Sequence, residues 1–252
     1  MSLLDLKKKF VSFVFQPSCF FCGSEIQSSN HVCTDSSQIA CDACYDNIVG
    51  TCLNRCYTCG VETNPLNPFG SRCNLCRGQD FKFERAFAIG TYRDQLRQCI
   101  LDLKRGFEEK KAFQLGILLG DLSDKLDLPS DIDIVVPVPS HWRRRISRRG
   151  LHVADTLADG FCRSTGLKKN RSLLKCTRHT QKQSKLRPAQ RIKNVRGAFQ
   201  INNKISLSNV RILLLDDVMT SGATVNECAR LLLRSGAETV SVAVAARATG
   251  VS

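Results

Sequence analysis

Four pairs of cysteines in the first third of the chain constrain its fold more than any other feature. In each pair two residues separate the cysteines, and the pairs are Cys19/Cys22, Cys41/Cys44, Cys56/Cys59 and Cys73/Cys76. A C-x-x-C turn places two thiolates on one side of a tight hairpin, and two such turns supply the four ligands of a tetrahedral ion. Taken in sequence order, the pairs are separated by 18 and 13 residues, close to zinc-ribbon spacing. The pattern predicts two four-cysteine zinc sites in tandem, although the order in which the turns combine stays open.

The zinc ions are expected to be structural. A module of about 60 residues with few large apolar side chains cannot rely on its own core, so the metal supplies folding energy. Redox-active dithiols are an alternative use of C-x-x-C, but the strand-helix context of a thioredoxin-like site is missing. Cys33, Cys52 and His31 exceed the eight ligands and are interpreted as ordinary side chains.

The predicted compartment is the cytoplasm. The 14 cysteines would suggest disulfides in a secreted chain. However, the apolar run that follows Lys7–Lys9 is short and ends at Pro17, which does not resemble a signal peptide. No stretch approaches the roughly 18 apolar residues that would span a bilayer.

Beyond residue 80 the pattern changes to alternating strands and helices. Apolar runs predict strands at 86–90, 132–138, 211–215 and 239–246, and helical spacing of apolar residues predicts helices near 92–103, 113–120, 151–161 and 225–233. Such alternation indicates an α/β fold with a parallel sheet covered on both faces. We therefore expect a small double zinc ribbon over residues 1–80 and an α/β domain over residues 81–252, each with its own core.

The segment Ile212–Thr224 carries the clearest chemical signal. It runs from a buried strand through Asp216 and Asp217 to the start of a helix. Ligands of parallel sheets bind at the carboxyl ends of the strands, where two carboxylates can accept hydrogen bonds from vicinal hydroxyls or hold a divalent metal. The following loop offers backbone N–H groups, hydroxyls and the positive end of a helix dipole, all suited to phosphate. A diol on one side and a phosphate on the other describe a ribose 5-phosphate.

Other phosphate-binding folds lack their first requirement. The chain has neither the G-x-x-x-x-G-K-[ST] of a P-loop nor the G-x-G-x-x-G of a dinucleotide-binding turn. Simple helix capping would account for one of the two aspartates, but not for the whole order of residues.

These residues resemble the phosphoribosyl pyrophosphate (PRPP) motif of type I phosphoribosyltransferases. The whole chain is similar to the competence protein F (ComF) family, which joins a double zinc ribbon to that domain. The resemblance extends to Val135–Pro139, the arginine-rich run ending at Gly150, and a spaced signature before the PRPP strand. That signature consists of Thr180, Gln183, Leu186, Arg191, Asn194, Ala198 and Phe199.

The resemblance implies roles for individual residues. Asp216 and Asp217 would contact the ribose hydroxyls of PRPP bound with Mg²⁺, and Ser140 and His141 would lie at the pyrophosphate side. The loop on the 5-phosphate would comprise Thr220, Ser221, Gly222, Ala223 and Thr224. Leu151-His152-Val153 departs from the aromatic-Asn-Gln of the family. Residue 2 is Ser, so a glutamine-cleaving N-terminal cysteine is missing.

Positive charge is concentrated between residues 141 and 200. The chain carries a net charge of +14, and this stretch holds 17 Lys and Arg against two acidic residues. PRPP needs only a few cations, so the surplus fits a polyanion such as DNA. Candidate contacts to nucleic acid are Arg143, Arg144, Arg145, Arg148 and Arg149. Only Trp142, Phe161 and Phe199 could stack on bases here, so the expected affinity is electrostatic.

Two functions are compatible with these features. The first is a PRPP-fold protein that handles single-stranded DNA during uptake, as the competence resemblance implies, with the zinc ribbons contacting DNA or DNA-uptake proteins. The second is an Mg²⁺-dependent phosphoribosyltransferase of nucleotide metabolism, whose acceptor and general base the sequence does not identify. A lid formed by residues 180–196 would favour transfer, and an open basic groove would favour DNA.

Overall fold

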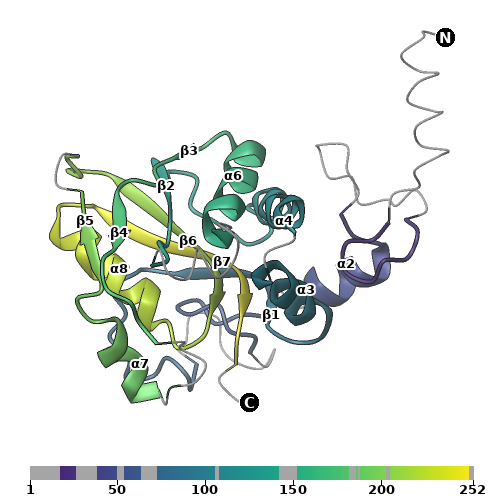
Figure 1. Ribbon diagram of the computed structural model, residues 1–252, viewed down its shortest axis with the longest axis horizontal. Helices are drawn as coiled ribbons and strands as arrows, with labels where there is room; N and C mark the ends of the chain where they lie inside the picture. The colour runs from purple at the N-terminus through teal and green to yellow at the C-terminus, as the bar shows by residue number, and fades with distance from the viewer. Residues whose placement is uncertain are drawn as a thin grey trace, which may run out of the picture.

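The protein is built around a parallel sheet. The computed structural model describes residues 18–26, 39–49, 54–63, 73–105, 108–141, 152–181, 186, 188–202 and 205–249. Its five-stranded sheet contains only parallel pairs (Figure 1). In sheet order the strands are β1 (Ala86–Thr91), β7 (Thr239–Arg247), β6 (Arg211–Met219), β2 (Ile134–Pro137) and β3 (Lys168–Lys169). The predicted α/β class is confirmed.

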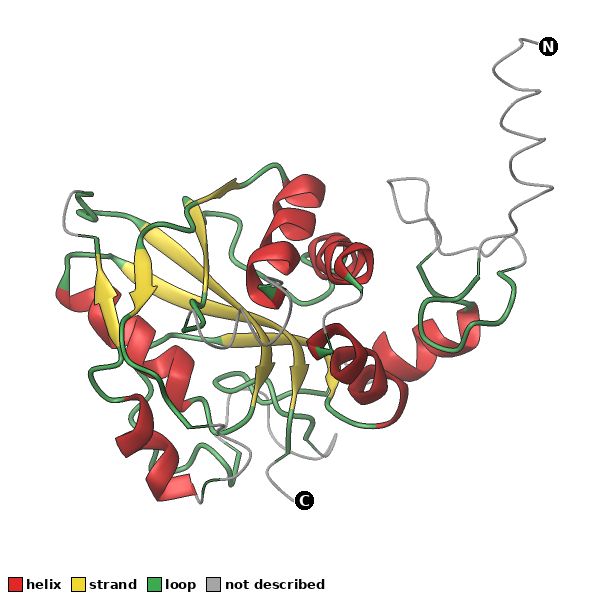
Figure 2. Ribbon diagram, in the orientation of Figure 1, coloured by secondary structure: helices red, strands yellow, loops and turns green. Residues whose placement is uncertain are grey.

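Helices lie on both faces of this sheet, as Figure 2 shows. Successive side chains of a strand point to opposite faces. Accordingly, Leu213 and Leu215 of β6 belong to one hydrophobic core and Ile212 and Leu214 to the other. The first core contains residues of α3 (Asp94–Lys104), α4 (Glu109–Asp121) and α6 (Val153–Thr165), and the second contains residues of α8 (Ala223–Arg234). Burial on both faces explains the continuous apolar runs of β6 and β7.

Glycines allow α4 and α6 to pack closely. A Cβ at Gly160 would lie 1.9 Å from the carbonyl oxygen of Phe113, and one at Gly116 would lie 2.1 Å from that of Leu157. Both distances are far below van der Waals contact. The two helix backbones therefore touch directly, and any side chain at these positions would force them apart.

Several short elements have no counterpart in the sequence prediction. These are α2 (Asp42–Val49), the edge strand β3, the antiparallel pair β4 (Leu174–Cys176) and β5 (Phe199–Ile201), and α7 (Pro188–Val195). In addition, β6 runs four residues beyond the predicted end at Leu215. It continues because β7 is equally long and pairs with it as far as Met219 and Arg247. Asp216 and Asp217 consequently lie within the second half of β6.

The second group of cysteines shares a core with the sheet. Cys56, Cys59, Cys73 and Cys76 are buried in the same cluster as the sheet residues Ala88 and Val244. This packing differs from the separate cores expected for the two parts of the chain. Cys19 and Cys44 instead lie in a small cluster of their own, with Ile26 and Ala40. The domain boundary near residue 80 stays a prediction.

Among the residues that the structure describes, no helix is long and apolar enough to cross a membrane.

Candidate functional site

The loop after β6 has the strand-loop-helix geometry predicted for a phosphate site. Gly222 is the N-cap of α8, with a left-handed φ of 77°. A Cβ at this position would also lie 2.9 Å from Cε of Met219 and 3.0 Å from Cε1 of Phe81. The positive φ selects glycine, and the two side chains leave little room for a larger residue. The residues Thr220–Thr224 thus join the carboxyl end of β6 to the first turn of α8, where backbone N–H groups and the positive end of the helix dipole favour an anion.

The two aspartates lie at the end of β6 that leads into this loop. Both are partly buried, and the N–H of Asp217 donates to Oδ1 of Asp216 at 2.8 Å. Oδ2 of Asp217 also lies 3.0 Å from Nζ of Lys104, the last residue of α3. Only 14% of the Asp217 side chain and 27% of the Lys104 side chain are exposed. Sequence reasoning missed Lys104, because nothing in an amphipathic helix indicates which strand its terminal lysine will face.

Ser140 and His141 follow β2, the strand next to β6 in the sheet. The N–H of Val138 donates to the carbonyl oxygen of Leu215 at 2.8 Å, which keeps the chain beside β6 after β2 ends. His141 is buried, and its ring centre lies 5.4 Å from that of His179. The structure therefore brings the predicted pyrophosphate-side residues to the same sheet edge as the aspartates.

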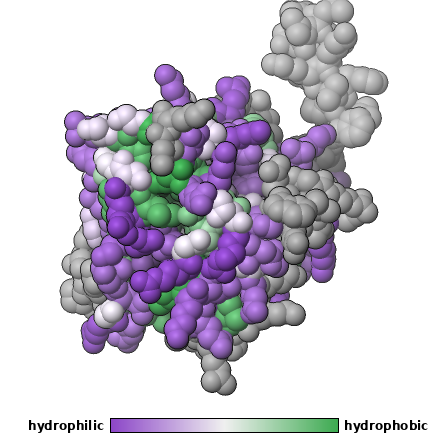
Figure 3. Space-filling view, turned by 60° about the vertical axis from the view of Figure 1, so that its left-hand side comes forward, coloured by the Kyte–Doolittle hydropathy of each residue, from purple (hydrophilic) through white to green (hydrophobic). Residues whose placement is uncertain are grey.

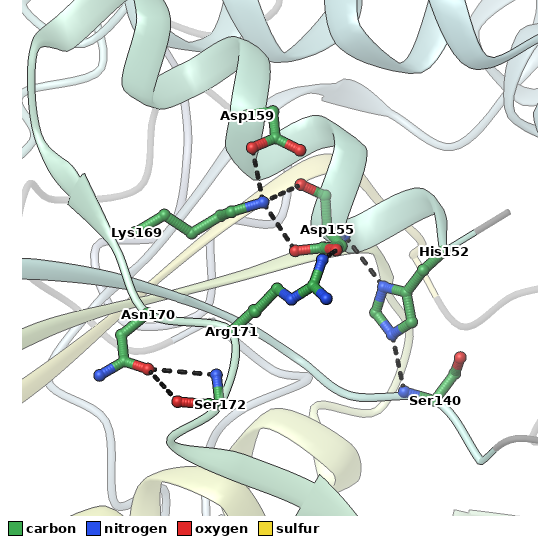
Figure 4. Close-up of polar contacts among 8 residues, drawn as sticks. All are labelled: Ser140, His152, Asp155, Asp159, Lys169, Asn170, Arg171 and Ser172. Carbon is green, nitrogen blue, oxygen red and sulfur yellow. Dashed lines mark hydrogen bonds and ion pairs between the residues drawn. The ribbon is translucent and has the colours of Figure 1, made fainter. Parts of the chain in front are cut away.

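His152 connects this edge to α6, as Figure 4 shows. Its Nε2 lies 2.9 Å from the backbone nitrogen of Ser140, and its Nδ1 lies 3.0 Å from that of Asp155 in the first turn of α6. A neutral imidazole accepts through one nitrogen only, so each tautomer keeps one of the two bonds. A residue that departs from the family pattern thus anchors the segment that carries Ser140.

Part of the basic stretch has structural partners. Nζ of Lys169 lies 2.8 Å from Asp155 and 2.5 Å from Asp159, the two acidic residues of the stretch (Figure 4). Arg178 donates to the carbonyl oxygens of Asn194 and Arg196. These contacts hold β3 and α7 in place, and the two carboxylates offset the charge of Lys169.

The residues proposed to contact nucleic acid lie outside the described ranges. They are Arg143, Arg144, Arg145, Arg148 and Arg149. Trp142 also lies outside them, whereas Phe161 and Phe199 are 1% and 6% exposed and belong to the two cores. The latter two rings cannot stack on bases, because they pack against the sheet.

The signature that precedes β6 shapes the chain around α7. Asn194 pairs with the backbone of Gln181 through both ends of its side-chain amide, at 3.0 and 3.1 Å. Arg191 donates to the carbonyl oxygen of Leu186 at 2.9 Å. Gln183 lies outside the described residues.

The eight paired cysteines form two groups that fit metal sites. Their sulfur atoms lie within 4.8 Å of one another in each group, which combines Cys19/Cys22 with Cys41/Cys44 and Cys56/Cys59 with Cys73/Cys76. This is the pairing in sequence order. A tetrahedral zinc ion with Zn–S bonds of about 2.3 Å separates its sulfurs by roughly 3.8 Å. Contacts of 3.7 Å in the first group and 3.5 to 3.6 Å in the second agree with that geometry.

The chemistry of the second group also favours a cation. All four cysteines of this group are buried, which disfavours charged thiolates that have no counter-ion. Four buried thiolates would repel one another, and a divalent ion offsets that cost. Zn²⁺ held by Cys56, Cys59, Cys73 and Cys76 would have no open coordination position, which fits a structural role. Cys33, Cys52 and His31 lie outside the described residues.

Sequence comparisons agree with this architecture. Residues 146–250 match the phosphoribosyl transferase domain family. Competence protein F of Haemophilus influenzae is 29% identical over 202 residues, which cover 77% of this chain and 84% of that protein. DNA utilization protein YhgH of Escherichia coli strain K12 is 31% identical over 193 residues, which cover 74% of this chain and 81% of that protein. The chain belongs to the competence protein F family. As a ComF protein, it combines a phosphoribosyltransferase domain with two cysteine groups able to hold zinc.

Proposed function

We propose that this ComF protein binds PRPP with Mg²⁺ at the carboxyl end of β6. The observation that carries the proposal is the continuous path from Asp216 and Asp217 through the glycine-capped loop into α8. The backbone N–H groups of Ser221–Thr224 receive the 5-phosphate, and the two carboxylates accept hydrogen bonds from the ribose hydroxyls. Mg²⁺ neutralises charge on the pyrophosphate, which extends toward Ser140 and His141.

Isothermal titration of the full chain with PRPP in MgCl₂ tests this site. In the double variant Asp216→Asn, Asp217→Asn each hydrogen bond loses its charged acceptor, so binding should weaken by about 1.5 to 3 kcal/mol per bond. Asp131→Asn is the matched control, since Asp131 pairs with Arg211 at the other end of β6. A wild-type protein that does not bind PRPP, or a double variant that binds as tightly, would refute the proposed site.

We further propose that the protein handles single-stranded DNA during DNA uptake. The basic stretch supports this role, and so do the names of its relatives, competence protein F and DNA utilization protein. Hydrophilic residues cover most of the face in Figure 3, around a smaller hydrophobic area. The buried Phe161 and Phe199 leave electrostatic attraction as the main source of affinity.

The salt dependence of oligonucleotide binding tests this second role. For a single strand, the log-log slope should be roughly −0.7 per phosphate neutralised. Changing Arg143, Arg144 and Arg145 to alanine should reduce the slope by about two units, because fewer counterions are released, while PRPP affinity stays unchanged.

A second triple variant controls for net charge. The exposed Arg97, Arg105 and Arg234 lie outside the basic stretch, so their change to alanine should leave the slope nearly unaltered. If the wild type does not bind the oligonucleotide and the first triple variant loses PRPP, these arginines serve the pyrophosphate. The alternative function, Mg²⁺-dependent phosphoribosyl transfer, would then be favoured.

A further inference from the structure

One buried guanidinium joins the second cysteine group to the phosphate loop. Arg247, the last residue of β7, is 3% exposed. Its Nε donates to the carbonyl oxygen of Cys59 at 2.8 Å, and its Nη1 donates to that of Met219 at 3.0 Å and also to that of Thr220. A single side chain therefore bonds the turn that carries a metal ligand and the two residues where the phosphate loop begins.

The charge of Arg247 suits this position. Zn²⁺ with four thiolates carries two net negative charges, and a buried guanidinium beside it is stabilised by that charge. The partners of Arg247 are backbone carbonyls, which accept bonds in fixed directions. Its side chain is thereby held by the metal group on one side while it fixes Met219 and Thr220 on the other.

A second connection reaches the helix end of the same loop. Asp80 to Lys82 follow Cys76 closely in the chain. The N–H of Lys82 donates to Oδ1 of Asn226 at 2.6 Å, and Nδ2 of Asn226 donates to the carbonyl oxygen of Asp80 at 3.2 Å. Asn226 lies in the first turn of α8, and the ring of Phe81 packs against Gly222. Residues that closely follow the cysteine group in the chain therefore contact the middle of the phosphate loop and the first turn of α8.

The cysteine group is also fixed to the sheet. The N–H of Ala86, the first residue of β1, donates to the carbonyl oxygen of Thr58 at 3.1 Å. A Cβ at Gly60 would lie 2.6 Å from the carbonyl oxygen of Ala86, so the turn and the strand touch through their backbones. Thr91 at the other end of β1 donates to Glu62 at 2.7 Å. The turn is thus a rigid support for Arg247.

We propose that the second cysteine group, with its metal bound, is a structural part of the PRPP site, and that Arg247 and Asn226 are positioning residues coupling metal occupancy to PRPP affinity. The coupling to PRPP rests on the proposed function, whereas the ordering of the loop does not. Because coupling between two sites is reciprocal, bound PRPP should also raise the affinity of this group for its metal. No such effect is expected at Cys19, Cys22, Cys41 and Cys44, whose described contacts lie in a separate cluster.

Hydrogen exchange and PRPP titration of the zinc-loaded full chain test the proposal. Arg247→Met keeps the length of the side chain and removes its donors. It should speed amide exchange in residues 219–226 at least tenfold and weaken PRPP at least tenfold, while zinc content stays unchanged. Arg211→Met is the matched control at the opposite end of the sheet, where Arg211 pairs with Asp131 and Asp133. It should change neither readout more than twofold.

A milder variant covers the case in which Arg247→Met fails to fold. Asn226→Ala removes the second connection at the partly exposed start of α8 and should speed exchange of the same amides. If neither variant alters exchange of residues 219–226, the proposal is overturned. If exchange changes but the wild type binds no PRPP, the loop support stands and the proposed function fails. If exchange changes and PRPP affinity does not, the coupling is wrong.

Discussion

The close crossing of α4 and α6 makes a quantitative prediction for Gly160→Ala. The new Cβ would lie 1.9 Å from the carbonyl oxygen of Phe113 and 2.9 Å from the backbone nitrogen of Ile117. Both atoms belong to a helix backbone, so the helices must separate by more than an ångström. Overpacking of this kind costs about 1 to 3 kcal/mol or more, and the better helix propensity of alanine returns about 1 kcal/mol. We expect a net loss of about 2 kcal/mol.

Thermal unfolding followed by circular dichroism measures this loss. For a chain of this size, about 2 kcal/mol lowers Tm by about 4 to 8 °C. Arg163→Ala on the exposed side of α6 is the control and should stay within about 0.5 kcal/mol of the wild type. If Gly160→Ala proved neutral or stabilising, as a glycine-to-alanine change is at an open helical position, the backbone contact between α4 and α6 would be refuted.

Three further predictions concern the metal, the pH dependence and the ligand site. Metal analysis should find two zinc ions per chain, and a single ion in the wild type would contradict the prediction of two four-cysteine sites. The variant Cys56→Ser should retain one zinc ion. It should also lower the stability of the sheet, since the second cysteine group shares the core of the sheet. Burial of Glu227 disfavours its charge, but hydrogen bonds from Arg230 and the N–H of Gly197 outweigh burial and hold the pKa of that carboxyl below its usual range. The contribution of Glu227 to the free energy of unfolding should therefore be complete above the unfolded pKa of about 4.3. It should be lost as the pH falls through the lower pKa of the folded state. The urea midpoints of unfolding at pH 7 and pH 3 should lie closer together in Glu227→Gln than in the wild type. If the difference between the two midpoints is the same in both proteins, this carboxyl does not cause the pH dependence. Lys104→Met should weaken PRPP binding at least tenfold, because it leaves Asp217 as an uncompensated anion beside an anionic ligand. If titration gives the variant and the wild type the same affinity for PRPP, Lys104 lies outside the site.

Local sequence patterns were sufficient to predict four of the five strands of the sheet and the cysteine groups. The apolar runs of β6 and β7 reflect burial on both faces, and C-x-x-C spacing reflects the geometry of a metal-binding turn. The glycine of the phosphate loop was likewise predictable, since only glycine adopts its φ without strain. Each of these features depends on neighbouring residues.

The remaining features depend on contacts between distant parts of the chain. Arg247 bonds Cys59 across 188 positions, and Lys104 meets Asp217 from another element. Neither pair leaves a periodic pattern in the sequence. For the same reason the sequence offers Phe161 and Phe199 as candidate stacking residues, although packing against the sheet buries both rings. The short β4, β5 and α7 contain too few apolar residues to produce a recognisable period.

The position of bound PRPP tests the central claim most directly. A crystal structure of the full chain with PRPP and Mg²⁺ should place the 5-phosphate about 3 Å from the backbone nitrogens of Ser221–Thr224. The ribose hydroxyls should lie within hydrogen-bonding distance of Asp216 and Asp217. PRPP bound elsewhere on the protein, with the loop between β6 and α8 unoccupied, would contradict the account.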